Sequence, residues 1–174
     1  MPRNSSKPHN AILYFLHHAN NEHLGKLKLM KLLYYLDFDH FEKCGESVTG
    51  DAYRKLDYGP APINGDVVLT DMQQKGLLRI EKVRMGDGEQ YRYTPLAEFN
   101  ACAFSTTEME VLADVARKGE HHSRSEIVSA THGEAPWRAA RMGDLIPYEL
   151  AYYRKKFAVE GLEDEEPTRA SASV

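Results

Sequence analysis

KLKLMKLLYYLDFDHFEKC, residues Lys26–Cys44, is the densest apolar run in the chain. If the stretch is helical, its apolar side chains leave little polar face, and such a helix is normally buried inside a larger fold. A membrane span is disfavoured because Lys28, Lys31 and Asp37 would each cost roughly 2.5–3.5 kcal/mol in a bilayer. The stretch therefore predicts the buried central helix of a soluble domain, ending at Gly45, a residue type suited to a helix C-terminus.

The chain as a whole has the composition of a globular protein. Its 174 residues are 42% hydrophobic and 28% charged, so one domain with a sizeable core is expected. Cys44 and Cys102 do not indicate a disulfide-stapled secreted protein. The N-terminal residues lack the apolar core of a signal peptide, and no membrane segment follows. We expect a cytoplasmic protein with no membrane partner.

The net charge of −4 is concentrated at the C-terminal end. Residues 160–174 contain five acidic residues and one arginine, which leaves the rest of the chain close to neutral. A neutral body has no general attraction for nucleic acid or anionic membranes. We predict a single domain over residues 1–159, followed by a disordered acidic tail over residues 160–174.

The remaining sequence predicts further helices and one β-hairpin. Period-two alternation on both sides of Gly86-Asp87-Gly88 predicts an antiparallel hairpin over residues 77–95. Capping-box patterns predict helix starts at Ser105 and Ser123. The other expected elements are a helix over residues 8–21, a strand over 48–56, a rigid turn over 58–62, a helix from Pro62 or Asn64 to Gly76 with Val67, Val68, Leu69 and Met72 on its buried side, and a final helix from Pro147 with Leu150, Tyr153 and Phe157 facing the core.

These elements predict a mainly α, α+β fold of about six helices around the helix 26–44, with a small antiparallel β element. The order helix, strand, helix, hairpin over residues 26–95 is compatible with a winged-helix layout. Against DNA binding, the helix that would enter the major groove carries Asp66 and Asp71 but only one lysine, Lys75. The basic residues that would lie on the wing are Arg79, Lys82, Arg84 and Arg92.

Catalytic and metal-binding patterns are weak. Asp37 and His40 form an i,i+3 pair that could share a metal ion, but no second ligand cluster follows at a convincing spacing. Cys44 lies at the negative end of a helix dipole, which disfavours the reactive thiolate. No glycine-rich phosphate loop is present. We therefore expect no metal, no cofactor and no enzymatic activity. Most of the many aromatic residues are expected in the core, and any exposed group of them would form a protein-binding patch.

Three segments together resemble the Panacea domain of SocA-like antitoxins. They are KLMKLLYYLDFDHFEKCG (residues 28–45), AYRKLDYGPAP (residues 52–62) and THGEAPW (residues 131–137). The resemblance covers about residues 12–157. It implies an antitoxin of a bacterial or prophage toxin–antitoxin pair that acts by protein–protein contact.

The resemblance also implies the partners. These are a cognate toxin and, for at least one type of family member, an ATP-dependent protease to which the antitoxin delivers its toxin as an adaptor. A winged-helix-like DNA-binding transcriptional regulator remains the alternative, and a metal-dependent enzyme using Asp37 and His40 is a third hypothesis. The candidate partner-binding residues that fall in the three matching motifs are Lys28, Lys31, Tyr35, Tyr58, His132 and Trp137.

Overall fold

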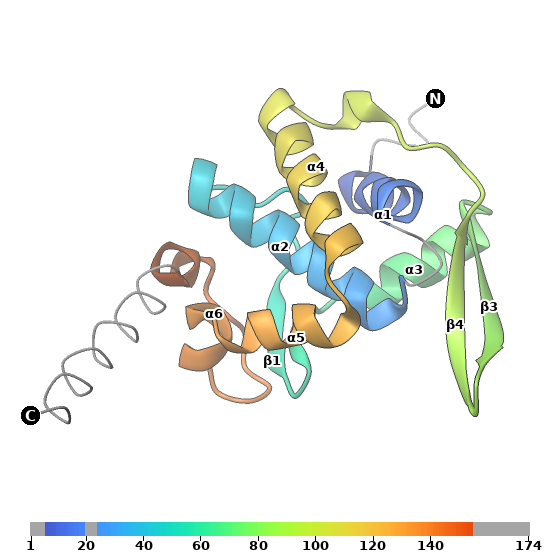
Figure 1. Cartoon of the computed structure of the whole chain (residues 1–174). Coiled ribbons are helices and arrows are strands. Elements are labelled where there is room, and N and C mark those ends of the chain that lie inside the picture. The colour runs from blue at the N-terminus through green and yellow to red at the C-terminus, as the bar shows by residue number, and fades with distance from the viewer. Residues whose placement is uncertain (1–5, 20–23, 155–174) are drawn as a thin grey trace, which may run out of the picture.

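The computed structural model describes residues 6–19 and 24–154, and helix α2 (Lys26–Cys44) lies at its centre (Figure 1). Twelve of the 19 residues of α2 are buried, and Gly45 follows with a φ of 75°. The prediction of a buried central helix is therefore confirmed, with the predicted bounds. Helix α2 contacts other elements from both the N-terminal and the C-terminal parts of the chain.

Helices α1 (Lys7–His18) and α4 (Thr106–His121) pack against each other and against α2. The capping box predicted at Ser105 is present: its hydroxyl accepts from the Glu108 backbone N–H at 3.1 Å. Gly119 lets α4 approach α2 closely, because a Cβ at this position would lie 2.9 Å from a methyl group of Leu32.

Strands β1 (Tyr53–Leu56) and β2 (Gly59–Pro62) form a small antiparallel hairpin. A rigid turn was predicted over residues 58–62, and this prediction was wrong for Gly59–Pro62, which form strand β2 although two of them are prolines. The register explains how: the backbone N–H of Ile63 donates to the Ala52 carbonyl, so Pro60 and Pro62 fall at the alternate positions that make no ladder bonds.

The strand predicted over residues 48–56 was correct only for its last part, because the preceding segment binds a buried carboxylate. Val48 and Thr49 donate their backbone N–H groups to Asp37 Oδ1 at 2.8 and 2.7 Å. The hydroxyls of Thr49 and Tyr53 donate to Oδ2 at 2.5 Å each. Burial raises the pKa of Asp37, and the hydrogen bonds from Thr49 and Tyr53 oppose that rise.

Helix α3 (Gly65–Gln74) is followed by the hairpin of β3 (Leu78–Met85) and β4 (Gly88–Pro95), which projects from the body of the molecule (Figure 1). The predicted hairpin is confirmed. On α3 the prediction was partly wrong: Leu69 and Met72 are buried, whereas the side chain of Val67 is 66% exposed.

The C-terminal part contains α5 (Arg124–His132), α6 (Ala135–Ala139) and two 3-10 helices, η2 (Ala101–Ala103) and η3 (Tyr148–Tyr153). The predicted final helix is present as the 3-10 helix η3, whose three-residue turn leaves Tyr153 exposed, contrary to prediction. Phe157 and the predicted acidic tail lie outside the described residues.

The part of the chain that the structure describes contains six α-helices and two separate two-stranded antiparallel sheets. The expected mainly α, α+β fold is confirmed. Within the same residues, none of the helices combines the length and the apolar character that crossing a membrane requires.

Candidate functional site

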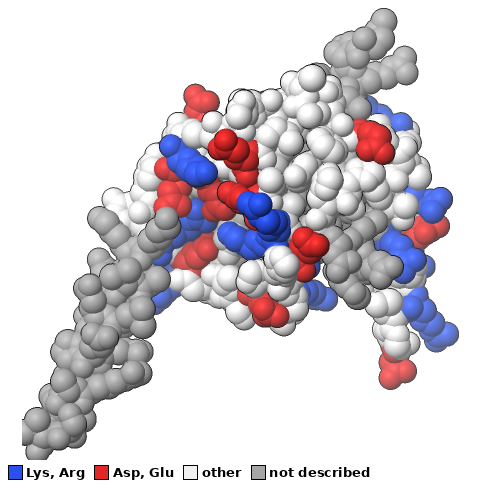
Figure 2. Space-filling model, turned by 45° about the horizontal axis from the view of Figure 1, so that its top comes forward, with Lys and Arg blue, Asp and Glu red and all other residues white. Residues whose placement is uncertain are grey.

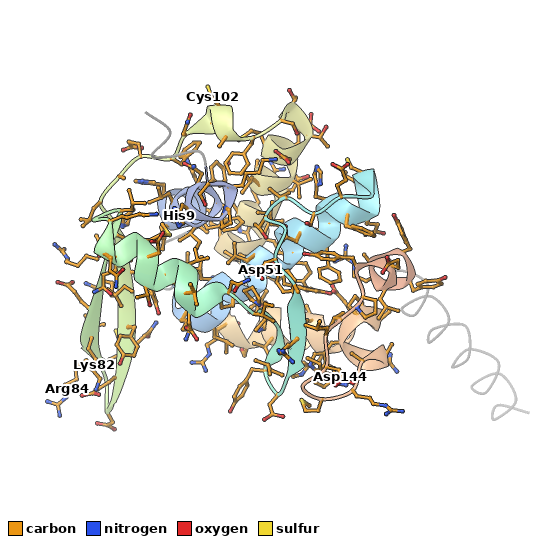
Figure 3. The ribbon with its side chains drawn as sticks, turned by 180° about the vertical axis from the view of Figure 1, so that it is seen from behind. His9, Asp51, Lys82, Arg84, Cys102 and Asp144 are labelled. Carbon is orange, nitrogen blue, oxygen red and sulfur yellow. The ribbon has the colours of Figure 1, made fainter. Side chains whose placement is uncertain are left out.

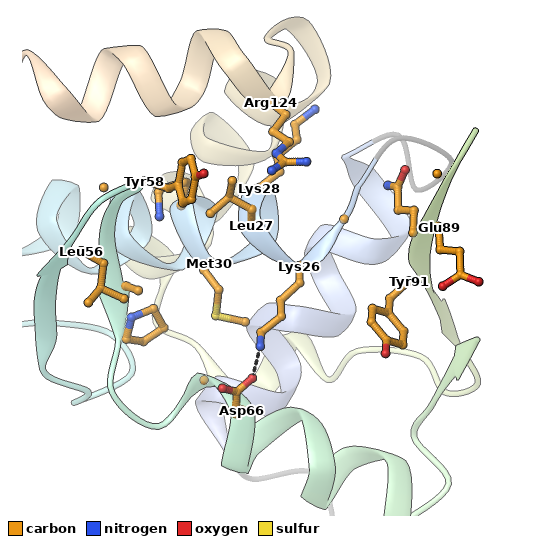
Figure 4. A pocket seen from close by; sticks show the side chains of 18 of the residues that line it. Lys26, Leu27, Lys28, Met30, Leu56, Tyr58, Asp66, Glu89, Tyr91 and Arg124 are labelled. Carbon is orange, nitrogen blue, oxygen red and sulfur yellow. Dashed lines mark ion pairs between the residues drawn. The ribbon is translucent and has the colours of Figure 1, made fainter. Parts of the chain in front are cut away.

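A groove with a volume of about 630 Å³ opens between the first turns of α2, the β1–β2 turn, the start of α3 and the free end of the β3–β4 hairpin (Figure 4). Part of its floor is the Met30 side chain, which reaches from α2 to the start of α3. A Cβ at Gly65 would lie 2.6 Å from the Met30 sulfur, so a larger residue there would require the Met30 side chain to move. Lys26 forms an ion pair with Asp66 across the groove (Figure 4).

Two of the predicted partner-binding residues, Lys28 and Lys31, line the groove, but their side chains are almost entirely buried at 4% and 1% exposure. Lys31 Nζ donates to the Pro60 carbonyl at 2.8 Å and so holds β2 against α2. Burial lowers the pKa of Lys31 to about 8. Burial also lowers the pKa of Lys28, which nearby Glu126 partly offsets.

Replacement of Lys31 by methionine is expected to remove a pH-dependent contribution to stability. Because folding lowers the pKa of Lys31 from 10.5 to about 8, the folded chain binds fewer protons than the unfolded chain between these values. Its contribution to the free energy of unfolding therefore rises as the pH rises from about 8 towards 10. Urea unfolding should show this rise in the wild type and a flatter profile in Lys31→Met.

The control is Lys43→Met, at an exposed position of the same helix, which should follow the wild-type profile. A Lys31→Met profile parallel to that of the wild type between these pH values would contradict the prediction.

Exposed apolar side chains stand on two opposite walls of the groove. Leu56 and Tyr58 come from the β1–β2 turn, and Met85 and Tyr91 come from the β3–β4 hairpin. Tyr58, a predicted partner-binding residue, is 64% exposed. Tyrosine and methionine side chains in such positions are typical of protein-binding surfaces.

The two predicted partner-binding residues of the third motif, His132 and Trp137, do not line the groove. Their rings stack with centroids 4.1 Å apart, and Lys55 Nζ lies 4.1 Å from the Trp137 ring centroid. Trp137 Nε1 donates to the Leu56 carbonyl at 2.8 Å. This stack supports the strand that presents Leu56 to the groove.

Tyr35 is buried, with no surface to offer a partner. It belongs to a polar cluster in which Tyr34 donates to Glu134 Oε2 at 2.7 Å, and Arg154 Nη2 lies 2.7 Å from an oxygen of Asp39. Burial raises the pKa of Tyr35, and the charge of Glu134 adds to this effect. The structure places Tyr35 with the residues that hold α2 to the C-terminal part of the fold.

The four basic hairpin residues Arg79, Lys82, Arg84 and Arg92 are exposed and interleaved with acidic residues. Lys82 and Arg84 lie near the free end of the hairpin (Figure 3). Arg79 pairs with Glu81 at 3.1 Å, Lys82 pairs with Glu89, and Arg92 stands opposite Glu81 in the register. Figure 2 likewise shows cationic and anionic side chains interspersed on the face that it presents. This arrangement does not make the continuous basic surface that a nucleic acid requires.

The Asp37–His40 pair has other partners in the fold. Asp37 accepts the four hydrogen bonds from residues 48, 49 and 53, and His40 Nδ1 lies 2.6 Å from the Glu46 carbonyl oxygen. Among residues 6–19 and 24–154, no three histidine, cysteine or acidic side chains are grouped as a metal site would require.

Sequence reasoning did not identify Leu56, Met85 or Arg124 as groove residues. Leu56 and Met85 could have been recognised from the sequence as exposed apolar residues, since each is a large apolar residue directly before a tight turn. Arg124 carries none, because its place in the groove depends on how α5 packs against α2.

Comparison with known proteins supports a family assignment. The family model described as "Antitoxin SocA-like, Panacea domain" matches residues 29–138, which is more than half of the chain. The matched region extends from α2 into α6 and includes most of the groove, but it begins after the groove residues Gly25, Lys26, Leu27 and Lys28. Comparisons with curated proteins and with solved structures found no match.

Proposed function

Because the chain belongs to the SocA-like antitoxin family through its Panacea domain, we propose that it neutralises a cognate toxin by direct protein–protein contact. The family match is the observation that carries this proposal. The groove adds support, since four exposed apolar side chains stand on its walls: Leu56, Tyr58, Met85 and Tyr91. Tyrosine is enriched among the residues that supply most of the binding energy in protein interfaces, and methionine is enriched at interfaces in general.

The proposal includes no catalytic step and no cofactor. Neutralisation takes place in a bacterial cytoplasm, where the chain either sequesters the toxin or delivers it to an ATP-dependent protease. The acidic start of α3 and the neutralised charges of the hairpin favour a protein partner over DNA.

Co-expression with the product of the neighbouring reading frame tests the proposal. Expression of that product alone is expected to arrest growth, and co-expression of this chain is expected to restore growth and give a complex that co-purifies. Absence of toxicity together with absence of a complex would overturn the proposal.

The same experiment separates the two modes of neutralisation. A stable complex with an unchanged toxin half-life indicates sequestration. Rescue with a shortened toxin half-life, lost in a strain lacking the protease, indicates an adaptor.

A further inference from the structure

The charged side chains that line the groove include more cations than anions, and only some of the cations are paired with a carboxylate. Four cationic residues and two acidic residues line it: Lys26, Lys28, Lys31, Arg124, Asp66 and Glu89. The groove therefore carries an excess of positive charge, although the chain as a whole is negative.

Most of these charges already have partners. Lys26 pairs with Asp66, Glu89 pairs with Lys82, and Lys31 donates to a backbone carbonyl. Among the described residues, the side chains of Lys28 and Arg124 make neither a hydrogen bond nor an ion pair, although the charge of nearby Glu126 acts on Lys28. Both line the groove on the α5 side (Figure 4).

The Lys28 side chain is also fixed in place. Its stem is buried in the packed first turns of α2, so little side-chain entropy remains to be lost when a ligand binds. The attraction between a partly desolvated ammonium and an opposite charge is stronger than between two fully solvated ions. The position is therefore suited to receive a carboxylate.

Apolar surface surrounds this cationic pair. The half-buried Leu27 lies between Lys28 and Met30, and the exposed Tyr58 stands beside Leu27 on the side of the β1–β2 turn (Figure 4). On the opposite side, Lys26 and Lys82 are already paired with Asp66 and Glu89, so that side offers no unpaired cation to a uniformly anionic ligand such as a nucleic-acid backbone. The favoured ligand carries one or two carboxylates next to an apolar side chain.

We propose that the groove binds an acidic segment of the toxin, with a carboxylate on Lys28 and Arg124 and an adjacent aliphatic or aromatic side chain between Leu27, Met30 and Tyr58. This inference rests on the proposed antitoxin function and names the chemistry of its partner. Charge complementarity is the feature that selects this occupant.

Two full-length variants test the proposal in the co-expression system and by calorimetry with the purified toxin. Arg124→Glu reverses the exposed charge, and glutamate in the first turn of α5 interacts favourably with the helix dipole, so the substitution is compatible with the helix. Lys28→Met removes the charge and keeps the buried stem. Each is expected to raise the Kd about 10- to 100-fold and to reduce its dependence on salt.

Matched controls use one exposed lysine at the other end of α2. Lys43→Glu and Lys43→Met make the same charge changes about 22 Å away along the helix and should leave the Kd within about twofold. If the wild type restores growth and the groove variants bind as tightly as the controls, the groove proposal is overturned while the antitoxin function stands. If the wild type neither binds the toxin nor restores growth, the groove proposal and the antitoxin proposal are both overturned.

Two other occupants of the groove, the acidic tail of this chain and a second copy of the chain, would give different experimental results. A full-length variant with Glu163→Gln, Asp164→Asn, Glu165→Gln and Glu166→Gln tests the acidic tail of the chain itself. If Arg124→Glu no longer changes the Kd for the toxin when it is added to this tail variant, the tail is the occupant of the groove and the toxin proposal is wrong. If the chain alone sediments as a dimer that Arg124→Glu dissociates, a second copy occupies the groove and the proposal is equally wrong.

Discussion

Replacement of Asp37 by alanine is expected to lower the free energy of unfolding by about 3–5 kcal/mol, because several buried donors lose their acceptor at once. The carboxylate accepts from two backbone N–H groups and two hydroxyls, contributed by Val48, Thr49 and Tyr53. The Val48 N–H is buried and cannot turn to water, whereas Thr49 is half-buried and the Tyr53 hydroxyl keeps the Leu33 carbonyl as an acceptor. Urea unfolding monitored by circular dichroism measures the loss.

Asp57→Ala is the matched control, because Asp57 is exposed in the β1–β2 turn. Its effect should stay within about 0.5 kcal/mol. Asp37→Asn keeps one oxygen acceptor and should fall between the wild type and Asp37→Ala. A loss in Asp37→Ala no larger than that of the control would show that the loop 46–52 does not depend on this carboxylate.

Replacement of Gly59 by alanine is expected to cost about 3 kcal/mol from two independent causes. Gly59 has a φ of 105°, a conformation that residues with a Cβ rarely adopt. A Cβ there would also lie 2.5 Å from Thr131 Oγ1 and 2.7 Å from Lys31 Cε. Thermal and urea unfolding measure the total.

Gly50→Ala separates these two causes. Gly50 has a φ of 76° but nothing within 4 Å of the added Cβ, so its alanine variant should lose only about 1 kcal/mol through backbone strain. If both variants lose the same amount, Gly59 is required only for its backbone conformation and not for the contact between β2 and α5. If Gly59→Ala loses more, the additional cost belongs to that contact, which holds one wall of the groove.

The central helix could be predicted from sequence because its apolar residues leave no alternative to burial. The capping boxes at Ser105 and Ser123 were equally predictable, since both the side-chain and the backbone partners are local in sequence. The β3–β4 hairpin follows from alternation on both sides of a glycine turn.

The elements that sequence reasoning missed depend on contacts between distant residues. Pro60 and Pro62 argue against a strand until the register with β1 is known. The segment 48–52 has strand-like residues, but its N–H groups bind Asp37, eleven residues earlier than Val48. A local pattern contains neither fact.

The candidate site was predictable in part. The motifs led to Lys28, Lys31 and Tyr58, which the structure brings to one groove, but sequence could not show that both lysines are buried. It also could not separate His132 and Trp137, which support strand β1, from the residues that line the groove. Whether any of these residues contacts a toxin stays a prediction.

The contact that ends the described chain also determines how the fold responds to mechanical load. Arg154 lies 2.7 Å from oxygens of both Asp39 and Glu42, so its guanidinium links the C-terminal end directly to α2. An unfoldase pulling on the chain beyond Arg154 would therefore transmit force to the central helix before it reached either hairpin. Because α2 contributes more buried residues to the core than any other described element, yielding at that point is expected to release a large part of the fold at once.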